Sequence, residues 1–419
     1  MSDGFTFVHC ADLHLDSPFE GVRSAEPSVA SILCDATFRA FGNVIDLAIR
    51  ERADFLIIAG DVYDGANRSL RAQLRFRDGL RRAVENGVRC FVSHGNHDPL
   101  TGWEAGLSLP EGVHRFGGDV ERVTVKRGGS ELCRLYGVSY RARNVQENLS
   151  RRFKAETEGP FSIGVLHCNV GGNPDHDNYA PCTMDDLAAG GFDYWALGHI
   201  HTRSVLREKD PRIVMPGNTQ GRSVRETGPR GCYLVRVDAG GSVASEFVPT
   251  DVVRWFVHFV DIADMDTLDD MLEALFRLKE DVRGRAEGRA AVLRLEITGR
   301  GSLHTALAQL NPDRDLVLPL RENEPERPDF VWVESVNLRT RRAVDVAQRR
   351  RVEDFTGVFL RRIEDVRAGG DTAGVLREML SRRPEYRAIA RYAGFSDDDL
   401  LAILDEAEAW GLDHLLGEE

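Results

Sequence analysis

The sequence predicts an α/β protein whose first half contains a sheet of parallel strands. The run Phe55–Ala59 is wholly apolar, which is typical of a strand buried on both faces, and it ends abruptly at Gly60 and Asp61. Strand-like and helix-like segments alternate over residues 5–93, an order that implies parallel strands with right-handed crossovers. Open α/β sheets bind ligands at the carboxyl ends of their strands, so we expect Asp61 to lie in such a site.

Apolar spacing defines the other elements of residues 1–250. Residues 35–52 and 68–86 place apolar side chains at helical spacing, and a third helix fits residues 145–156. Strand-like segments at 120–126 and 132–139 follow each other directly, so the sheet turns antiparallel there or a second sheet begins. The remaining strands are expected at 5–11, 90–93, 163–166, 194–197, 203–207, 212–215, 232–237 and 243–248.

Two further regions follow a boundary near Thr250. Residues 253–340 read as strand, helix, strand, helix, strand, with the charged, proline-containing segment 311–328 as an exposed loop. From residue 344 the pattern is helical to the end. We therefore expect domains at 1–250, 251–340 and 341–419, in which the second is a small α/β domain and the third is helical. The amphipathic acidic helix 397–416 suits the binding of a partner, and packing against its own domain is an equal alternative.

Composition limits the class of protein. The 419 residues are 42% hydrophobic, and no apolar run approaches the roughly 18 residues of a membrane span. The segment Met1–Phe5 lacks a basic leader, and seven cysteines without a Cys-x-x-Cys pair argue against a disulfide framework. We expect a cytoplasmic protein with no membrane association.

Charge is unevenly distributed along the chain. The formal net charge of −13 argues against a general basic surface for nucleic acid. Residues 339–391, however, hold fourteen Arg against eight acids, whereas residues 392–419 hold nine acids and no Lys or Arg. The two segments carry net charges of opposite sign, which suggests that they contact different molecules or surfaces.

Metal-ligand residue types follow five of the predicted strands. Carboxylates, imidazoles and one amide form a mixed oxygen and nitrogen donor set that suits Mn²⁺, Fe²⁺ or Zn²⁺. In an extended turn residues i and i+2 point the same way, so each Asp-x-His or His-x-His pair can grip an ion from one side. Two ions about 3.5–4 Å apart that share a carboxylate are the arrangement of in-line phosphoryl transfer. The strand-end residues are Asp12, His14, Asp61, Asn96, His97, His167, His199 and His201.

Each piece alone has a simpler explanation. Asp61 could cap a helix, Asp12 and His14 occur at this spacing by chance, and His167 at the end of an apolar strand could be a satisfied core histidine. The ordered set, with a strand before each member, favours a metal site.

These motifs resemble the calcineurin-like metallophosphoesterase superfamily, whose pattern is D-x-H, G-D-x-x-D, G-N-H-D/E, H and G-H-x-H. All five blocks are present, and the chain is similar in detail to the SbcD-type DNA repair exonucleases and their YhaO-like branch. The segments that carry the closer resemblance are 9–19, 95–99, 216–222 and 225–231. The resemblance is specific over residues 5–240. It implies a sandwich of two mixed β-sheets flanked by helices, followed by a capping domain and C-terminal helices.

The resemblance also implies roles for these residues. One metal ion would be held by Asp12, His14, Asp61 and His201, and the second by Asp61, Asn96, His167 and His199. His97 would face the scissile phosphate, and Asp98 would orient its imidazole. Asp64 matches the last position of the second block and is expected to support the ligands. Some nucleases of this group have a histidine there, which leaves the part of Asp64 in exonuclease activity open.

The activity expected from the resemblance is a Mn²⁺-dependent 3′-to-5′ DNA exonuclease with endonuclease capacity in DNA repair. Its expected partners are DNA, an SMC-like ATPase subunit and a second copy of the chain. Two alternatives stay open: a small-molecule phosphodiesterase or phosphatase on the same site, and a regulatory subunit whose catalysis is vestigial. Arginine suits phosphate, although ordinary surface ion pairing is an equal alternative for each one. The candidate substrate contacts are Arg141, Arg222, Arg225, Asn173, His176 and Tyr179.

Overall fold

The computed structural model describes residues 4–20, 26–65, 68–102, 105–156, 158–172, 178–389 and 395–417. The chain forms two compact units. The first comprises Met1–Val257, Lys279–Arg294 and Arg321–Glu334, and the second comprises His258–Leu278, Leu295–Leu320 and Ser335–Glu419. The three-domain division expected from the sequence stays a prediction.

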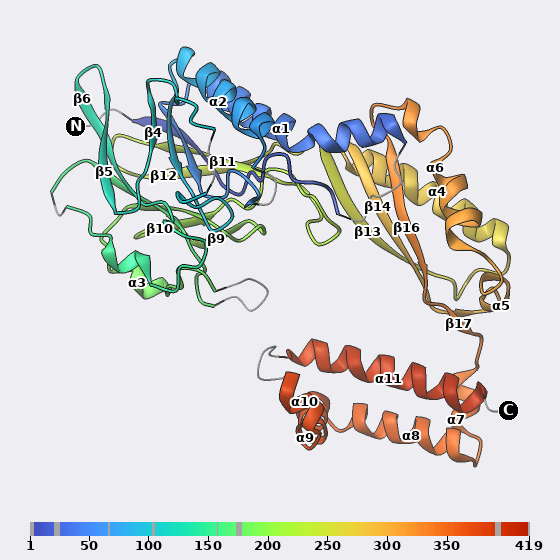
Figure 1. The fold of residues 1–419 in the computed structure, drawn as a ribbon. Helices are drawn as coiled ribbons and strands as arrows, with labels where there is room; N and C mark the ends of the chain where they lie inside the picture. Colours follow the sequence, from blue (N-terminus) through green and yellow to red (C-terminus); the bar gives the residue numbers. More distant parts are fainter. Residues whose placement is uncertain are drawn as a thin grey trace. The chain divides into compact units, whose positions relative to one another are not determined.

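The first unit contains two six-stranded mixed sheets, which confirms the predicted α/β sandwich (Figure 1). The first sheet has the order β12-β11-β1-β2-β3-β4, in which β1 to β4 are parallel and β11 runs antiparallel to β1. These strands are β1 (Phe5–Cys10), β2 (Phe55–Ala59), β3 (Arg89–Ser93), β4 (Val113–Arg115), β11 (Gly231–Val237) and β12 (Val243–Pro249).

The second sheet has the order β5-β6-β7-β8-β10-β9. It opens with the antiparallel pair β5 and β6, so the direct succession of two strand-like segments near residue 130 marks both an antiparallel turn and a new sheet. Strands β6, β7, β8 and β10 are parallel. The bounds are β5 (Glu121–Arg127), β6 (Ser130–Gly137), β7 (Phe161–His167), β8 (Tyr194–Gly198), β9 (Ser204–Arg207) and β10 (Arg212–Met215).

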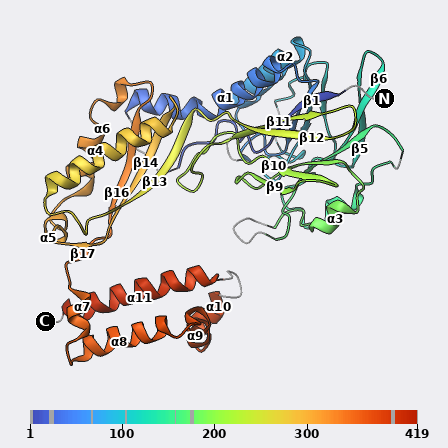
Figure 2. The same ribbon diagram turned by 180° about the vertical axis from the view of Figure 1, so that it is seen from behind.

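Two apolar layers enclose the first sheet of this sandwich. Phe7, Phe55 and Phe91 fill the space between the sheets, where Phe7 and Phe55 stack with ring centroids 5.0 Å apart. Helices α1 (Pro27–Arg50) and α2 (Leu70–Glu85) lie side by side and cover the other face of the first sheet (Figures 1 and 2). The two layers cover opposite faces of strands β1, β2 and β3 and bury them on both sides.

Helix α1 starts at Pro27, eight residues before the predicted start, and the difference has a packing reason. Its first turns carry Val29 and Leu33, which pack against Trp255 and Trp332 in a separate cluster of the first unit. The extra turns of α1 therefore belong to the same apolar cluster as Val253, Val292 and Phe330.

The third sheet has the order β13-β14-β16, and the division between the two units passes across it. Its strands are β13 (Val253–Asp261), β14 (Ala290–Thr298) and β16 (Val331–Leu338), and α4 (Leu268–Arg285) follows β13 as the spacing predicts. Short elements follow β14: β15 (Arg300–Gly301), α5 (His304–Leu307), η3 (Asp313–Val317), α6 (Leu318–Arg321), η4 (Glu324–Glu326) and β17 (Arg341–Arg342).

Two predicted segments are wrong. The proposed loop 311–328 is largely helical, because its Leu316, Val317 and Leu320 are buried and supply the apolar side that a helical turn needs. The proposed helix 145–156 is reduced to the single turn η2 (Leu149–Arg152), in which the side chain of Asn148 accepts from the amide of Ser150.

The rest of the second unit is helical, as predicted. Helix α11 has the acidic first turn Asp397–Asp399, and its Leu400 and Leu404 pack with Ala373 and Leu376 of α9. Among the described residues, no helix combines the length and the apolar character that a membrane crossing requires. The remaining helices are α3 (Met184–Ala188, in the first unit), α7 (Val346–Arg350), α8 (Phe355–Ala368), α9 (Thr372–Ser381), α10 (Pro384–Ile389) and α11 (Asp397–Gly417).

Candidate metal centre

The carboxyl ends of β1, β2, β3, β7 and β8 meet at one edge of the sandwich. Each carries one or two of the seven metal-ligand candidates: Asp12, His14, Asp61, Asn96, His167, His199 and His201. Six of the seven are buried, and His201 is half-buried. Side chains of these types are seldom buried without partners, so their arrangement requires a physical account.

The backbone is unusual at these strand ends. Asp12, His14, Asp61 and His199 all have positive φ angles, of 51°, 43°, 50° and 99°. Non-glycine residues adopt positive φ angles at an energetic cost, and such strained residues cluster at active sites and ligand-binding positions. The turns that follow the strands thus keep strained backbone conformations that direct these side chains toward a common site.

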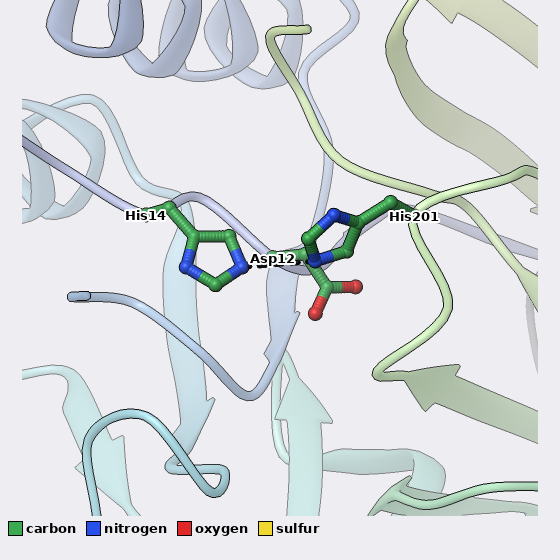
Figure 3. A group of neighbouring side chains, drawn as sticks. All are labelled: Asp12, His14 and His201. Carbon is green, nitrogen blue, oxygen red and sulfur yellow. Dashed lines mark hydrogen bonds between the residues drawn. The ribbon is translucent and has the colours of Figure 1, made fainter. Parts of the chain in front are cut away.

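Asp12, His14 and His201 form the first cluster of donor atoms (Figure 3). The Nε2 atoms of His14 and His201 are 3.0 Å apart and face each other. Two neighbouring ligands with bonds of about 2.1 Å to one ion are about 3.0 Å apart when they meet at a right angle. The separation therefore fits two imidazoles that coordinate the same ion.

Asp61 and His167 form the second cluster, together with Asp12. Nε2 of His167 lies 3.3 Å from Oδ2 of Asp61 and 3.1 Å from Oδ1 of Asn96. Nδ1 of His167 donates to the carbonyl of Ala59 at 3.0 Å, which leaves Nε2 as the nitrogen that faces the oxygen donors. Oδ2 of Asp61 also lies 3.9 Å from Nε2 of His14, so this carboxylate stands between the two clusters.

His199 joins the clusters through its backbone and its ring. Its amide donates to both carboxylate oxygens of Asp12 at 3.1 Å, and its ring centroid lies 5.2 Å from that of His167. The ring of Tyr179, a candidate substrate contact, lies edge-on to His199 with centroids 5.9 Å apart. Tyr179 therefore borders the centre at the His199 side.

The electrostatics of the centre follow from burial and close pairing. Burial raises the pKa of Asp12 to about 6, although His167 and His201 act against the rise. Burial acts in the same direction on Asp61, but the charges of His167 and His14 hold its pKa well below the ordinary value. Burial would lower the pKa of His167, yet the neighbouring Asp61 raises it to about 9. Asp61 and His167 therefore stabilise each other's charged forms through their close contact.

His97 lies beside this centre with a third of its side chain exposed. Its backbone amide donates to Oδ1 of Asp61 at 3.0 Å, and its ring packs edge-on against His14 with centroids 5.0 Å apart. Nδ1 lies 3.2 Å from Oδ1 of Asp64, so Nε2 is the nitrogen left for another partner. Burial lowers the pKa of His97, but the hydrogen bond to Asp64 and the charge of Asp61 outweigh it and raise the pKa overall.

The expectation that Asp98 orients His97 is wrong, because Asp64 makes that contact. Asp98 is fully buried and its Oδ2 lies 2.8 Å from Nδ1 of His94. It also accepts hydrogen bonds from the amides of Gly95, Val62 and Tyr63. These four donors connect the turn after β3 to the turn after β2. They occupy the acceptor positions of both Asp98 oxygens, so the carboxylate is not available to the imidazole of His97.

The candidate substrate contacts separate in the structure. Nη1 of Arg222 donates to Oγ of Ser17 at 2.8 Å and lies 3.8 Å from Oδ2 of Asp64, which places Arg222 beside the centre. Arg141 instead pairs with Asp119 and donates to the carbonyl of Gly118. Arg225 is exposed. The candidates Asn173 and His176 lie outside the described residues.

Sequence reasoning missed two residues of the site. Oε1 of Glu226 lies 2.6 Å from Nδ1 of His201, and Oγ of Ser17 donates to Oδ2 of Asp64 at 3.0 Å. Both lie inside segments that carry the family resemblance, so their positions were visible in the sequence. Their roles were not, because neither residue type is typical of a ligand in that context.

Comparison with known proteins agrees with this geometry. Residues 5–203 match the family model "Calcineurin-like phosphoesterase", and residues 255–341 match "Metallophosphoesterase YhaO, middle domain". The chain therefore belongs to the calcineurin-like metallophosphoesterase family, and it is a phosphoester hydrolase by class. The family and the donor set together indicate divalent metal ions.

The chain is similar in sequence to a YhaO protein and, at lower identity, to Mre11 proteins. The chain is 36% identical to "Uncharacterized metallophosphoesterase YhaO" of Bacillus subtilis (strain 168) over 412 residues, which cover 97% of each chain. It is 25% identical to "DNA double-strand break repair protein Mre11" of Thermoplasma acidophilum over 317 residues, covering 72% of this chain and 81% of the relative. The Mre11 protein of Sulfurisphaera tokodaii is 26% identical over 222 residues, 49% of this chain and 51% of the relative.

Proposed function

We propose that this chain is a two-metal DNA phosphodiesterase, a Mn²⁺-dependent 3′-to-5′ exonuclease with endonuclease capacity in DNA repair. The observation that carries the proposal is the adjacency of two donor clusters, which share Asp12 and between which Oδ2 of Asp61 lies 3.9 Å from His14 and 3.3 Å from His167. Asp12, His14 and His201 would hold one ion with Asp61, and Asn96, His167 and His199 would hold the other. When bound, the two ions supply Lewis-acid stabilisation of phosphoryl oxygens and activation of water.

His97 is the residue of the chain that acts on the substrate in this proposal. Asp64 holds its Nδ1 and leaves Nε2 on the half-open side of the centre. In that position Nε2–H can donate to a phosphoryl oxygen or protonate the leaving oxygen, which is general acid catalysis. Arg222, fixed by Ser17 beside Asp64, would contact a phosphate of the substrate, and Tyr179 would border it near His199.

DNA as the substrate is supported by the names of the Mre11 relatives and by the resemblance to SbcD-type exonucleases. By the same resemblance, the proposal includes an SMC-like ATPase partner and a homodimer. It also includes a cytoplasmic location, which the seven free cysteines favour. The domains at 1–250, 251–340 and 341–419 would serve cleavage, substrate capping and partner binding. Fe²⁺ and Zn²⁺ are the alternatives to Mn²⁺ for this donor set.

The test is degradation of end-labelled duplex DNA by the purified chain with Mn²⁺, beside a His97→Ala variant. We expect Mn²⁺-dependent shortening from 3′ ends, and a loss of about 10²- to 10⁴-fold in the variant. Absence of Mn²⁺-dependent degradation, or equal degradation by the variant, would contradict the nuclease proposal. Hydrolysis of bis-p-nitrophenyl phosphate without DNA degradation would favour the small-molecule alternative.

A further inference from the structure

The segment Pro216–Gly231 connects β10 to β11. It contains two of the segments that resemble the family, 216–222 and 225–231, but none of the proposed metal ligands. We call it the 216–231 loop. Asn218, Glu226 and Arg230 of this loop are polar or charged and yet buried, with 1%, 8% and 8% exposure. Buried polar side chains of a loop need specific partners, and the side chains of Glu226 and Arg230 both bind His201.

The 216–231 loop holds the backbone of His201. Nη1 of Arg230 donates to the carbonyl of His201 at 2.5 Å, and the amide of Asn218 donates to the same carbonyl at 3.3 Å. Gly217 has a φ of 76°, and a Cβ atom there would lie 2.6 Å from that carbonyl oxygen. The close approach of the loop to His201 therefore requires glycine at this position.

Glu226 of the same loop holds the side chain of His201. A carboxylate can only accept, so the 2.6 Å contact from Oε1 of Glu226 places the imidazole proton on Nδ1. The lone pair of the ring is then on Nε2, the atom that faces His14 in the first donor cluster. The other oxygen, Oε2, accepts from the backbone amide of Arg222 at 2.6 Å. Both oxygens of Glu226 are thus committed to donors.

Glu226 also connects His201 to the opposite side of the centre. Nη2 of Arg222 lies 3.6 Å from Oε1 of Glu226, and its Nη1 donates to Ser17, which donates to Asp64. Asp64 in turn contacts Nδ1 of His97. A continuous chain of side-chain contacts therefore connects Glu226 of the 216–231 loop to His97, the residue proposed to face the phosphate.

We infer that Glu226 is a positioning residue for the metal ligand His201 and that the 216–231 loop is a sixth block of the metal centre. The inference rests on the proposed function, since it assigns His201 to a metal ion. Carboxylates that bind the remote nitrogen of a ligating histidine fix its tautomer and its ring orientation, and their removal weakens metal affinity about 10- to 100-fold.

The test compares Glu226→Gln with wild type by Mn²⁺ titration calorimetry of the metal-free protein. Glutamine matches the shape of glutamate but presents one acceptor and one donor to the two donors His201 Nδ1 and Arg222 N. If the amide oxygen of the glutamine accepts from His201, its NH₂ group faces the backbone N–H of Arg222, and the two donors repel each other. If the side chain is flipped, its NH₂ group faces Nδ1 of His201, and the imidazole proton must move to Nε2, where it blocks coordination of the metal ion. We expect one of the two ions to bind about 10- to 100-fold more weakly and the other to keep its affinity.

Two further variants make the result specific. Glu226→Asp keeps both acceptors and is expected to lose less affinity than Glu226→Gln, although its carboxylate is withdrawn by one methylene. Glu208→Gln is the matched control, because Glu208 has an exposed side chain paired only with Arg212 in the described structure. Its Mn²⁺ affinities and the melting temperature of its metal-free form should equal those of wild type.

The outcomes separate this inference from the proposed function. If wild type binds two Mn²⁺ ions and Glu226→Gln binds both with unchanged affinity, the positioning role is overturned. Equal weakening of both ions together with a lower melting temperature of the metal-free variant would mean a merely structural role and would also overturn it. A wild-type chain that binds no Mn²⁺ would refute the proposed function and the inference together.

Discussion

Replacement of Gly95 by alanine would test whether Asp61 and His167 must keep their positions. Gly95 lies between Ser93, where β3 ends, and Asn96, and a Cβ atom there would lie 2.3 Å from Oδ1 of Asp61 and 2.7 Å from Nε2 of His167. Ordinary contact begins near 3.4 Å, so the carboxylate would have to move by about 1.1 Å. Gly95 cannot retreat instead, because its amide donates to the buried Asp98 at 2.8 Å.

The expected result is a folded protein with a damaged centre. A displacement of about 1 Å in a catalytic site costs roughly 10²-fold in rate, and overpacking of this kind costs about 1–3 kcal/mol of stability. We therefore expect about 100-fold slower hydrolysis of bis-p-nitrophenyl phosphate by Gly95→Ala, with weaker Mn²⁺ binding in calorimetry. Urea unfolding would show the stability loss.

The control is Gly42→Ala in helix α1. A Cβ atom at Gly42 would meet nothing within 4 Å, so the substitution should stabilise the helix by up to about 1 kcal/mol and leave hydrolysis unchanged. Hydrolysis and Mn²⁺ binding by Gly95→Ala within about threefold of wild type would refute the reasoning, because the contact distances leave no room for an unshifted Asp61.

Three further predictions concern single side chains. Asp61→Asn should weaken the binding of both Mn²⁺ ions together in calorimetry, since Oδ2 of Asp61 lies 3.9 Å from His14 in one cluster and 3.3 Å from His167 in the other; loss of one ion alone would contradict its bridging position. Asp64→Asn should slow hydrolysis about tenfold or more while both ions still bind, because its hydrogen bond is to Nδ1 of His97. Asp64 also lies within 4.8 Å of His14 in a third group of possible donors with His97, so weaker metal binding by this variant would show that Asp64 is itself a ligand. Burial lowers the pKa of His9 to about 3, below the ordinary value of 6.5, so the unfolded chain binds an extra proton between these pH values and stability falls as the pH falls below 6.5. This one residue should cost about 2 kcal/mol between pH 6.5 and pH 5, and His9→Gln should show a correspondingly shallower pH dependence in urea unfolding; an unchanged slope would contradict the assignment.

The two-sheet fold could be predicted because its signals are local. The apolar run before Asp61 and the helical spacing after it depend only on neighbouring residues, and β2 and α2 lie within two residues of their predicted bounds. Prediction failed where burial is decided by distant parts of the chain. The segment 311–328 looked like a charged loop, but Leu316 and Leu320 find an apolar environment that its own sequence does not reveal.

The same distinction applies to the site. The carboxyl ends of parallel strands lie at one edge of a sheet, so the ligands that follow β1, β2 and β3 could be grouped from order alone, and so could those that follow β7 and β8. The packing of the two sheets, which brings these two groups together, could not be predicted in this way. The partner of His97 could not be predicted. The neighbouring position in the sequence suggests Asp98, whereas the residue in contact in the structure is Asp64. Asp98 follows His97 directly, but the turn after β3 directs its carboxylate to His94 and to the turn that follows β2. A contact between side chains of two different turns depends on how both turns fold.

Glu226 extends this argument to the motif itself. Twenty-five residues separate it from His201, and β10 lies between them, so no spacing rule connects the two. Yet the glycine at 217, the arginine at 230 and the glutamate at 226 all act on one residue, His201. A motif that ends a strand can supply ligands directly. The 216–231 loop comes after the last ligand, and it can contribute only by fixing the proton and the orientation of a ligand already in place. This is why we expect its substitutions to change the affinity for one ion before they change the fold.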